Sequence, residues 1–328
     1  MTELTEILGI GEKSAEKLKE KGITTAEVFC TRRPEEIASI LGITIAKAKE
    51  LHAKAKDLVL SKVVVVLTGK EFEERKRTII KYIPTGIKKL DVCLGKPYGE
   101  GVPTDALMNV YGEWGAGKTQ LCMTIAVNSI PILGRPVIFI ETEPGTFSMA
   151  RLREIAEKRQ IALNEERDVF VIPASVITSP FTQFLAYEII EKNVAEGKLA
   201  PPGVIVVDSF SAKIREYYPG REVATYRSQE IARHIGKLQE LASKFNCAVL
   251  LTSQVYGVPD VDKVKESYMK FGDDKVGYGG DFLLHSVSIN LMVRTTSAET
   301  GEVITIDVPW APRERIPFKI TERGVEDV

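Results

Sequence analysis

The run Gly112-Glu113-Trp114-Gly115-Ala116-Gly117-Lys118-Thr119 matches the pattern G-x-x-x-x-G-K-[ST] at every position. An apolar stretch typical of a strand, Ala106–Tyr111, leads into it, and a helical pattern, Thr119–Ser129, follows it. In this order of strand, loop and helix, backbone N–H groups of the loop converge on phosphate oxygens. Lys118 would then reach the terminal phosphates, and the Thr119 hydroxyl would hold Mg²⁺. The alternative is a tight strand-to-helix turn with a surface lysine; the flanking patterns favour the phosphate-binding loop.

Length and composition suit a globular protein with one large and one small domain. Of the 328 residues, 44% are hydrophobic and 27% charged, enough for a packed core. Lys and Arg total 44 against 45 Asp and Glu, so any basic surface for nucleic acid must be local. The four cysteines, Cys30, Cys93, Cys122 and Cys247, form no C-x-x-C pair and favour reduced thiols in a cytoplasmic protein. The amino terminus does not resemble a signal peptide and no apolar run is long enough for a membrane span, so we expect no membrane association.

Residues 1–61 are predicted to form a small all-α domain. A short helical pattern, Ser14–Lys21, follows Leu8-Gly9-Ile10-Gly11, and a second unit runs from Pro34–Leu41 into a helix from Ile45 to about Leu60. The first unit resembles a helix-hairpin-helix, whose turn presents backbone N–H groups to DNA phosphates without reading sequence. Gly9, Gly11 and the neighbouring Lys13 are therefore candidate DNA contacts. An equally supported alternative is that the two glycines only join two helices.

Residues 62–82 are predicted to be a linker. The run Val63–Leu67 is short, β-branched and uncharged, which predicts a strand. Such a strand could pair with a sheet edge of this chain or of a neighbouring copy. Thr68–Lys81 is charged and has a helical pattern.

Residues 83–328 are predicted to form an α/β domain with a mostly parallel sheet. The predicted strands are Leu107–Tyr111, Val137–Glu141, Val169–Ile172, Val204–Asp208, Ala248–Ser253 and Ser288–Arg294. The helical patterns between them include Thr119–Ser129, Phe147–Gln160, Pro180–Glu196 and Ala224–Phe245. Nearly continuous apolar strands between helices indicate a sheet covered on both faces, which binds ligands at the carboxyl ends of its strands.

Polar residues follow four of the predicted strands. Besides the phosphate-binding loop, they are Glu141-Thr142-Glu143, Asp208-Ser209 and Thr252-Ser253-Gln254. Asp208 is predicted to complete the Mg²⁺ ligands opposite Thr119. Glu141 and Glu143 are both candidates to orient or deprotonate a water, and the residues alone leave the choice open. The Gln254 amide could sense a terminal phosphate.

Over nearly its full length the chain resembles the archaeal RadA branch of the RecA-family recombinases. The matching stretches include the amino-terminal hairpin, Gly112–Cys122, Ile140–Phe147, Val206–Ser209, Tyr218–Glu222, Thr252–Val255, Gly279-Gly280 and Ile320–Asp327. The resemblance implies a RecA-like P-loop ATPase core with a helix-hairpin-helix domain before it. It implies ATP and Mg²⁺ as cofactors, single-stranded DNA as a partner, and action in recombination and repair. Double-stranded DNA, and self-association or pairing with a main recombinase, are left open as further partners.

The resemblance also assigns roles to single residues. Glu143 is implied as the glutamate that activates water, with Lys118 and Gln254 beside it. Residues Gly112 to Gln120 are implied to hold the nucleotide phosphates, and Arg151 to lie along the adenine. Gln254 and His285 are implied to couple nucleotide state to DNA binding. Arg215, Tyr218 and Arg221 fall where the family has its first DNA-binding loop, and residues from about Pro259 to Gly277 where it has its second.

The chain also departs from the family pattern. Where the family carries Phe-x-x-Ala for polymerisation, this chain has Val66-Leu67-Thr68-Gly69. The second loop is longer and more charged, Pro144 is inserted after Glu143, and Ser148 replaces a usual arginine. Two functions therefore stay open. One is a DNA-dependent ATPase of the recombinase family, and the other is a non-filamentous paralogue that serves as an ATP-gated mediator with little turnover.

Overall fold

The computed structural model describes residues 2–63, 66–220, 222–257, 275–277, 280–297 and 299–328. The chain folds as two compact units, Met1–Arg75 and Lys76–Val328. The first carries η1 (Leu4–Glu6), α1 (Glu12–Glu20), α2 (Ala26–Thr31), α3 (Pro34–Leu41) and α4 (Ile45–Val63), and α5 (Gly69–Ile79) crosses the boundary. The predicted division into 1–61, 62–82 and 83–328 stays a prediction.

The first unit folds around its own apolar core. Leu4, Leu18, Phe29 and Ile37 are all fully buried there. The helices begin and end where the sequence provides caps: Pro34 opens α3, and Gly42 ends it with a positive φ of 67°. The all-α prediction is confirmed, although the sequence did not predict α2, because a six-residue helix gives a weak periodic signal.

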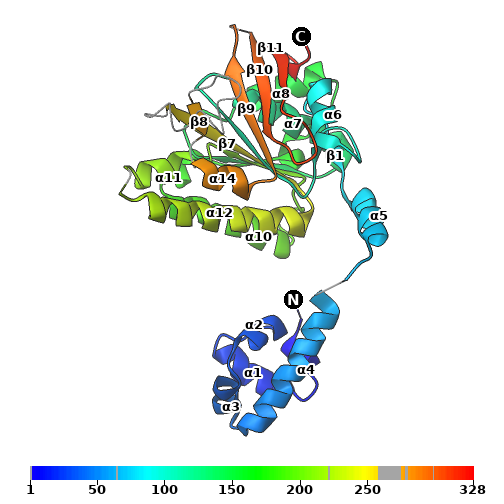
Figure 1. Ribbon diagram of the computed structural model, residues 1–328, viewed down its shortest axis with the longest axis vertical. Helices are drawn as coiled ribbons and strands as arrows, with labels where there is room; N and C mark the ends of the chain where they lie inside the picture. Colours follow the sequence, from blue (N-terminus) through cyan, green and yellow to red (C-terminus); the bar gives the residue numbers. More distant parts are fainter. Residues whose placement is uncertain (1, 64–65, 221, 258–274, 278–279, 298) are drawn as a thin grey trace. The chain divides into compact units, whose positions relative to one another are not determined.

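The second unit is built on one large sheet (Figure 1). Its strands, in spatial order, are β12 (Gly324–Glu326), β11 (Arg315–Thr321), β10 (Thr300–Asp307), β9 (Ile289–Thr295), β3 (Leu107–Gly112), β7 (Ala248–Gly257), β6 (Val204–Asp208), β4 (Val137–Glu141) and β5 (Val169–Ile172). The strands from β9 to β5 pair in parallel, while β9 to β12 pair antiparallel. In addition β8 (Lys275–Gly277) pairs with β7, and β1 (Tyr82–Ile83) pairs with β2 (Val102–Pro103).

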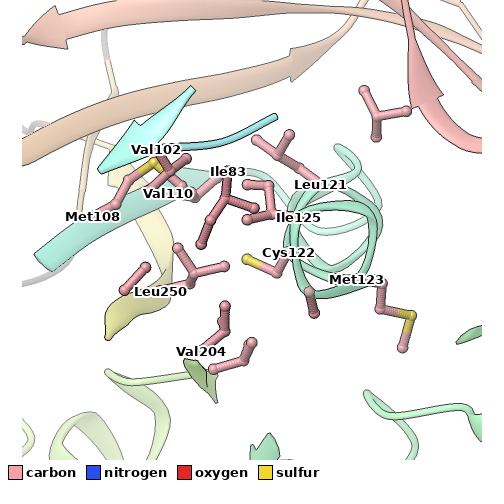
Figure 2. Close-up of a cluster of buried hydrophobic side chains, with 14 of the residues drawn as sticks. Ile83, Val102, Met108, Val110, Leu121, Cys122, Met123, Ile125, Val204 and Leu250 are labelled. Carbon is pink, nitrogen blue, oxygen red and sulfur yellow. The ribbon is translucent and has the colours of Figure 1, made fainter. Parts of the chain in front are cut away.

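Helices cover both faces of this sheet (Figure 1). One face packs against α6 (Lys88–Gly95), α7 (Lys118–Leu133) and α8 (Met149–Lys158), and the other against α10 (Pro180–Ala195), α11 (Ala212–Tyr217), α12 (Ala224–Phe245) and α14 (Gly280–Ser286). The short elements α9 (Glu165–Asp168) and η2 (Ala174–Val176) flank β5. Figure 2 shows Cys122 and Ile125 of α7 against Val110 and Leu250 of the central strands. The predicted α/β fold with a mostly parallel sheet is confirmed.

The described residues of the predicted strand Val63–Leu67 do not lie in a strand. Val63 is the last residue of α4, and Val66 and Leu67 lie outside any strand; the two residues between them lie outside the described part of the chain. A strand needs a neighbour to pair with, and Val66, whose surface is 92% exposed, packs against nothing that would hold it extended. The charged helical linker is confirmed as α5, which Thr68 caps through its contacts with Glu71.

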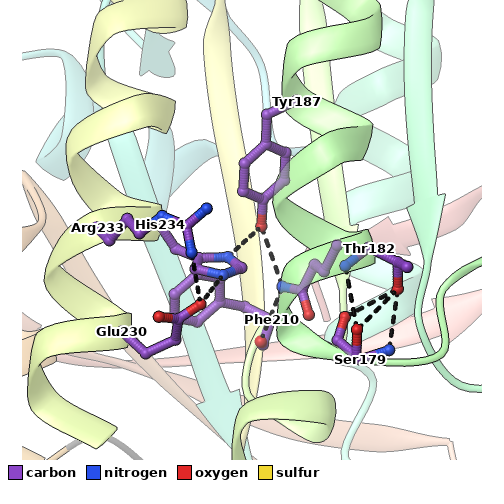
Figure 3. A network of polar contacts seen from close by, with 8 residues as sticks. Ser179, Thr182, Tyr187, Phe210, Glu230, Arg233 and His234 are labelled. Atoms are coloured by element: carbon purple, nitrogen blue, oxygen red, sulfur yellow. Dashed lines mark hydrogen bonds and ion pairs between the residues drawn. The ribbon is translucent and has the colours of Figure 1, made fainter. Parts of the chain in front are cut away.

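A buried polar network joins α10 and α12 beneath the sheet (Figure 3). Gln183 donates from Nε2 to the Tyr187 hydroxyl at 3.0 Å and to the Phe210 carbonyl at 3.1 Å. The Tyr187 hydroxyl lies 3.2 Å from Nδ1 of His234, whose Nε2 lies 3.2 Å from the Glu230 carboxylate. Burial lowers the pKa of His234 to about 3, so the ring is neutral at physiological pH. The network fixes α12 against the turn that follows β6.

Asp91 of α6 is a buried carboxylate whose charge costs stability. One oxygen accepts 2.7 Å bonds from both the backbone N–H and the hydroxyl of Thr85, yet burial raises its pKa to about 6. We expect Asp91→Asn to keep the acceptor and to raise the free energy of unfolding above pH 6. The gain should be about 3 kcal/mol, the value expected for a pKa raised from 3.8 to about 6.

The gain depends on pH in a defined direction. Because the pKa of Asp91 is raised in the folded state, the folded protein binds more protons than the unfolded chain between pH 3.8 and about 6. The contribution of Asp91 to the free energy of unfolding therefore falls as the pH rises through that range. Urea denaturation should therefore show the gain near pH 8 and little of it near pH 4. Asp307→Asn, at an exposed aspartate that ends β10, is the control. Equal gains at both pH values would contradict the prediction.

Candidate functional site

A cavity of about 380 Å³ opens at the carboxyl ends of β3, β4, β6 and β7. All four polar clusters that were predicted at strand ends contribute residues to its lining. They are Trp114, Gly115, Ala116, Gly117, Lys118, Thr119, Gln120, Glu143, Gly145, Thr146, Asp208, Ser209, Gln254 and Ile320. The prediction that these clusters meet at one edge of the sheet is confirmed.

The loop between β3 and α7 has the geometry of a phosphate-binding loop. Gly112 ends β3 so close to β9 that a Cβ there would lie 2.0 Å from the Val293 carbonyl oxygen. Gly117 takes a φ of 97° and caps the amino terminus of the 16-residue α7. The first N–H groups of a helix have no partner within the helix, so this end of α7 offers donors and a positive dipole to an anion.

Lys118 lies inside the cavity rather than at the surface. Its ammonium donates to the carbonyl oxygens of Gly112 at 3.0 Å and Glu113 at 2.7 Å. Burial lowers its pKa, because removing the ammonium from water disfavours the charged form. Trp114, by contrast, projects from the loop with 92% of its surface exposed.

Asp208 and Thr119 face each other across the cavity floor. The Thr119 hydroxyl donates to one carboxylate oxygen of Asp208 at 2.6 Å, and the Thr252 hydroxyl donates to the other. Burial raises the pKa of Asp208, with the two hydroxyls and Lys118 opposing the shift. A hydroxyl and a carboxylate are hard oxygen ligands, and Mg²⁺ in such sites takes its remaining ligands from phosphates and water. The Thr119 hydroxyl and the Asp208 carboxylate therefore fit Mg²⁺ that is bound together with a nucleotide. Among the described residues, no cluster of three His, Cys, Asp or Glu side chains suited to a metal occurs.

Glu141 and Glu143 have different surroundings. Glu141 ends β4, and its carboxylate accepts from the backbone N–H groups of Gly145 at 2.8 Å, Phe147 at 3.3 Å and Ala174 at 3.2 Å. Glu143 lies past the end of the strand and lines the cavity. β4 ends at Glu141 and a turn begins at Glu143, whose carbonyl oxygen accepts from the Thr146 N–H at 3.4 Å, so the two carboxylates lie in different surroundings. Glu141 holds the turn, and Glu143 is the carboxylate that lies in the cavity.

Gln254 connects Glu143 to α11. Its Nε2 lies 3.3 Å from Oε1 of Glu143, and its carbonyl oxygen accepts a hydrogen bond from the guanidinium of Arg215. Arg215 belongs to the predicted first DNA-binding loop, so a single amide joins that region to the cavity. Tyr218 caps α11 and packs partly buried beside Tyr217. Arg221 and most of the predicted second loop lie outside the described residues.

Four predicted nucleotide contacts, Gly112, Glu113, Arg151 and His285, are not part of the cavity lining. The carbonyl oxygens of Gly112 and Glu113 accept from Lys118 instead. Arg151 of α8 donates to Oε1 of Gln120 at 2.8 Å and to the Thr321 carbonyl, and pairs with Glu154. His285 lies exposed on α14. Their roles stay predictions. Sequence reasoning gave Thr252 no role of its own; its position at the end of a central strand, next to Asp208 in the sheet, is the signal that could have marked it.

Gly9 and Gly11 lie in the connection between η1 and α1. Gly9 has a φ of 107°, and a Cβ there would lie 2.9 Å from a methyl group of Leu51. Gly11 is extended and caps α1, and Lys13 is exposed in the first turn of that helix. DNA contact by these residues stays a prediction.

The fold and cavity define a class of protein: a P-loop nucleotide-binding protein with a RecA-like core. The Rad51 family model matches residues 75–328, and the chain belongs to that family. A model described as a SAM-like helix-hairpin-helix tandem matches residues 1–57. The predicted resemblance to RecA-family recombinases is confirmed.

Two curated relatives match nearly the whole chain. The "DNA repair and recombination protein RadA" of Aeropyrum pernix is 29% identical over 99% of this chain and 97% of its own length. The protein of the same name from Metallosphaera sedula is 29% identical over 98% of this chain and 94% of its own length. No helix among the described residues has the length and apolar character needed to cross a bilayer.

Proposed function

We propose that this protein is a DNA-dependent ATPase acting in homologous recombination and DNA repair, in which Mg²⁺-dependent hydrolysis of ATP is coupled to binding of single-stranded DNA. The observation that supports it most is the cavity in which the glycine loop, the Thr119–Asp208 pair and Glu143 meet. The Rad51-family match and the names of the two relatives support the biological role. ATP is the substrate, and DNA is the regulator.

The residues divide the chemistry among them. The loop amides and Lys118 bind the terminal phosphates, and Thr119 and Asp208 hold Mg²⁺, which would neutralise charge on the transferring phosphoryl group. Glu143 positions and deprotonates the attacking water in line with the leaving oxygen. The Gln254 amide bonds to both the Glu143 carboxylate and the Arg215 guanidinium, so a movement of Arg215 would change the hydrogen bond that holds Glu143. DNA that draws Arg215 toward a phosphate would therefore change how Glu143 is held.

A direct test is steady-state ATP hydrolysis with Mg²⁺ and single-stranded DNA varied independently. We expect no turnover without a divalent cation, slow turnover without DNA, and faster turnover with DNA. Turnover that continues in the presence of a chelator, or that ignores DNA at concentrations shown to bind, would contradict the proposal.

DNA binding should be electrostatic and insensitive to sequence. We expect Arg215→Ala and Lys13→Ala each to lower the slope of log Kd against log salt by roughly 0.7 to 1, because each variant removes one phosphate contact. Fluorescence anisotropy of a labelled oligonucleotide measures the slope. Arg153→Ala on α8, where the guanidinium pairs with Glu165, is the control. Binding that does not weaken with salt would refute both contacts.

A second candidate is a non-filamentous mediator of the main recombinase. It is favoured by Val66, which stands where the family's polymerisation motif has phenylalanine and which lies exposed outside any strand. Exchanging phenylalanine for valine forfeits about 1–2 kcal/mol of apolar burial at each junction between subunits. The smaller side chain would leave a filament shorter or less stable.

Assembly separates the two candidates. We expect the wild-type protein with ATP and single-stranded DNA to form short or no filaments by electron microscopy, and Val66→Phe with Gly69→Ala to lengthen them. Val328→Phe, at an exposed valine, is the control for added apolar surface. Long, regular filaments of the unmodified protein at low micromolar concentration would contradict the mediator function and support the recombinase.

A further inference from the structure

A second cavity, of about 180 Å³, lies in the unit Lys76–Val328 and shares no lining residue with the nucleotide site. It is formed by the end of α5, the small β1–β2 sheet, the turn after α6, and the connection between β10 and β11. Three aromatic rings line it, those of Tyr82, Tyr98 and Trp310. Two of them are well exposed, Tyr98 by 42% and Trp310 by 40%.

The rings are held in place by the surrounding backbone. The indole Nε1 of Trp310 donates to the Leu94 carbonyl at 3.0 Å, so its polar atom is satisfied while its ring stays partly exposed. Gly99 passes so close to Tyr82 that a Cβ there would lie 2.3 Å from the ring. An apolar wall whose orientation is fixed before binding costs little entropy when a flat ligand stacks on it.

Cations surround these rings. Lys76 and Lys96 line the cavity, and the guanidinium of Arg77 lies 5.4 Å from the centroid of the Tyr98 ring. The carboxylate of Asp105, which also lines it, already accepts a hydrogen bond from the Ser243 hydroxyl at 2.8 Å. The cavity thus combines stacking surfaces with positive charge, which is the combination that binds single-stranded nucleic acid: bases stack on the rings and phosphates meet the cations.

We propose that this cavity is a second contact site for single-stranded DNA, in which one base stacks against Tyr98 and Trp310 and the flanking phosphates meet Lys76 and Lys96. The proposal rests on the proposed function, since it adds a contact for the same polymer. It involves none of the residues expected to bind DNA in the first loop or the amino-terminal hairpin. An acidic peptide would use the same cations without requiring a base, so it is the competing outcome of the test.

The chain carries its own reporter for this site. Its only two tryptophans are Trp114 and Trp310, so Trp114→Phe leaves Trp310 as the sole indole. We expect oligo(dT) to quench the Trp310 emission of this variant. An abasic oligonucleotide of the same length and poly-glutamate should not, because neither offers a base to stack. Quenching by poly-glutamate equal to that by oligo(dT) would replace DNA with an acidic peptide and overturn the proposal.

Substitutions test the residues. In the Trp114→Phe background, Tyr98→Ala should weaken oligo(dT) binding at least about fivefold, the lower range for loss of one stacked base. Lys96→Ala should lower the salt slope by roughly 0.7, whereas Lys192→Ala, an exposed lysine on α10, should not. Anisotropy of a labelled oligonucleotide measures total binding in parallel. If the protein without these substitutions shows no DNA binding by anisotropy, the proposed function itself is refuted. If it binds DNA by anisotropy but the Trp310 emission is not quenched, only this second site is refuted.

Discussion

Replacing Lys118 with alanine is expected to lower the rate of ATP hydrolysis at least about 100-fold and to weaken ATP binding. The ammonium lies within the cavity and its pKa is lowered by burial, so the protein carries the cost of an incompletely solvated cation at this place. A bound phosphate would offset that cost through a direct charge pair, and the pair would strengthen as charge develops in the transition state. Its removal leaves the loop amides as the remaining donors.

The measurement is steady-state hydrolysis with Mg²⁺ and single-stranded DNA, together with equilibrium binding of a fluorescent ATP analogue. Lys158→Ala is the matched control, because that lysine is exposed on α8 and pairs with Glu322 away from the cavity. Thermal melting shows whether the folded protein loses stability when the carbonyl oxygens of Gly112 and Glu113 lose the Lys118 donor. Turnover within about threefold of the wild-type rate would remove Lys118 from the proposed machinery.

Glu143→Gln is expected to lower kcat by about 100-fold to 10,000-fold while ATP binding stays close to that of the wild type. Glutamine has nearly the same shape but cannot accept a proton, so the change removes a base and keeps the volume. The hydrogen-bond partner of the Glu143 carboxylate is the Gln254 amide, which lies outside the phosphate-binding loop. A loss confined to kcat is the signature of an interaction used only in the chemical step.

Glu141→Gln provides the matched control on the same segment. The Glu141 carboxylate accepts from three backbone N–H groups, so its amide counterpart should lower the melting temperature and alter kcat little. The two variants therefore predict opposite patterns of stability and turnover. If Glu141→Gln abolishes turnover and Glu143→Gln does not, the base is Glu141 and the turn is held by other contacts.

Much of the nucleotide site could be predicted from local sequence. Four polar clusters each followed an apolar strand, and parallel strands bring their carboxyl ends to one edge, so the meeting of Lys118, Asp208 and Gln254 required only topology. The choice between Glu141 and Glu143 could not be predicted, because it depends on where β4 ends and the chain turns. That point is set by backbone donors from Gly145 and Ala174, which lie apart in sequence.

The strand predictions that were wrong or missing share a physical origin, which is strand pairing. Val63–Leu67 has the composition of a strand, yet β-propensity describes the fit to a neighbouring strand more than a preference of the backbone itself. In the described part of the chain, Val66 and Leu67 have no such neighbour. Conversely, β10, β11 and β12 were not predicted, and each of them pairs antiparallel with the strand before it.

The buried histidine beneath the sheet contributes to the number of protons that this protein exchanges when it unfolds. In the folded protein the pKa of His234 is about 3, so its ring is neutral near pH 5. In the unfolded chain its pKa returns to its usual value near 6.5, so unfolding near pH 5 adds a proton to this ring. Asp91, whose pKa is raised to about 6, releases one over much of the same range. The two nearly cancel, so a flat acid-stability profile would conceal two opposed titrations. Calorimetry in buffers of different ionisation enthalpy would separate them: near pH 5, unfolding of Asp91→Asn should take up about one proton more than unfolding of the wild type, because the release from Asp91 is gone.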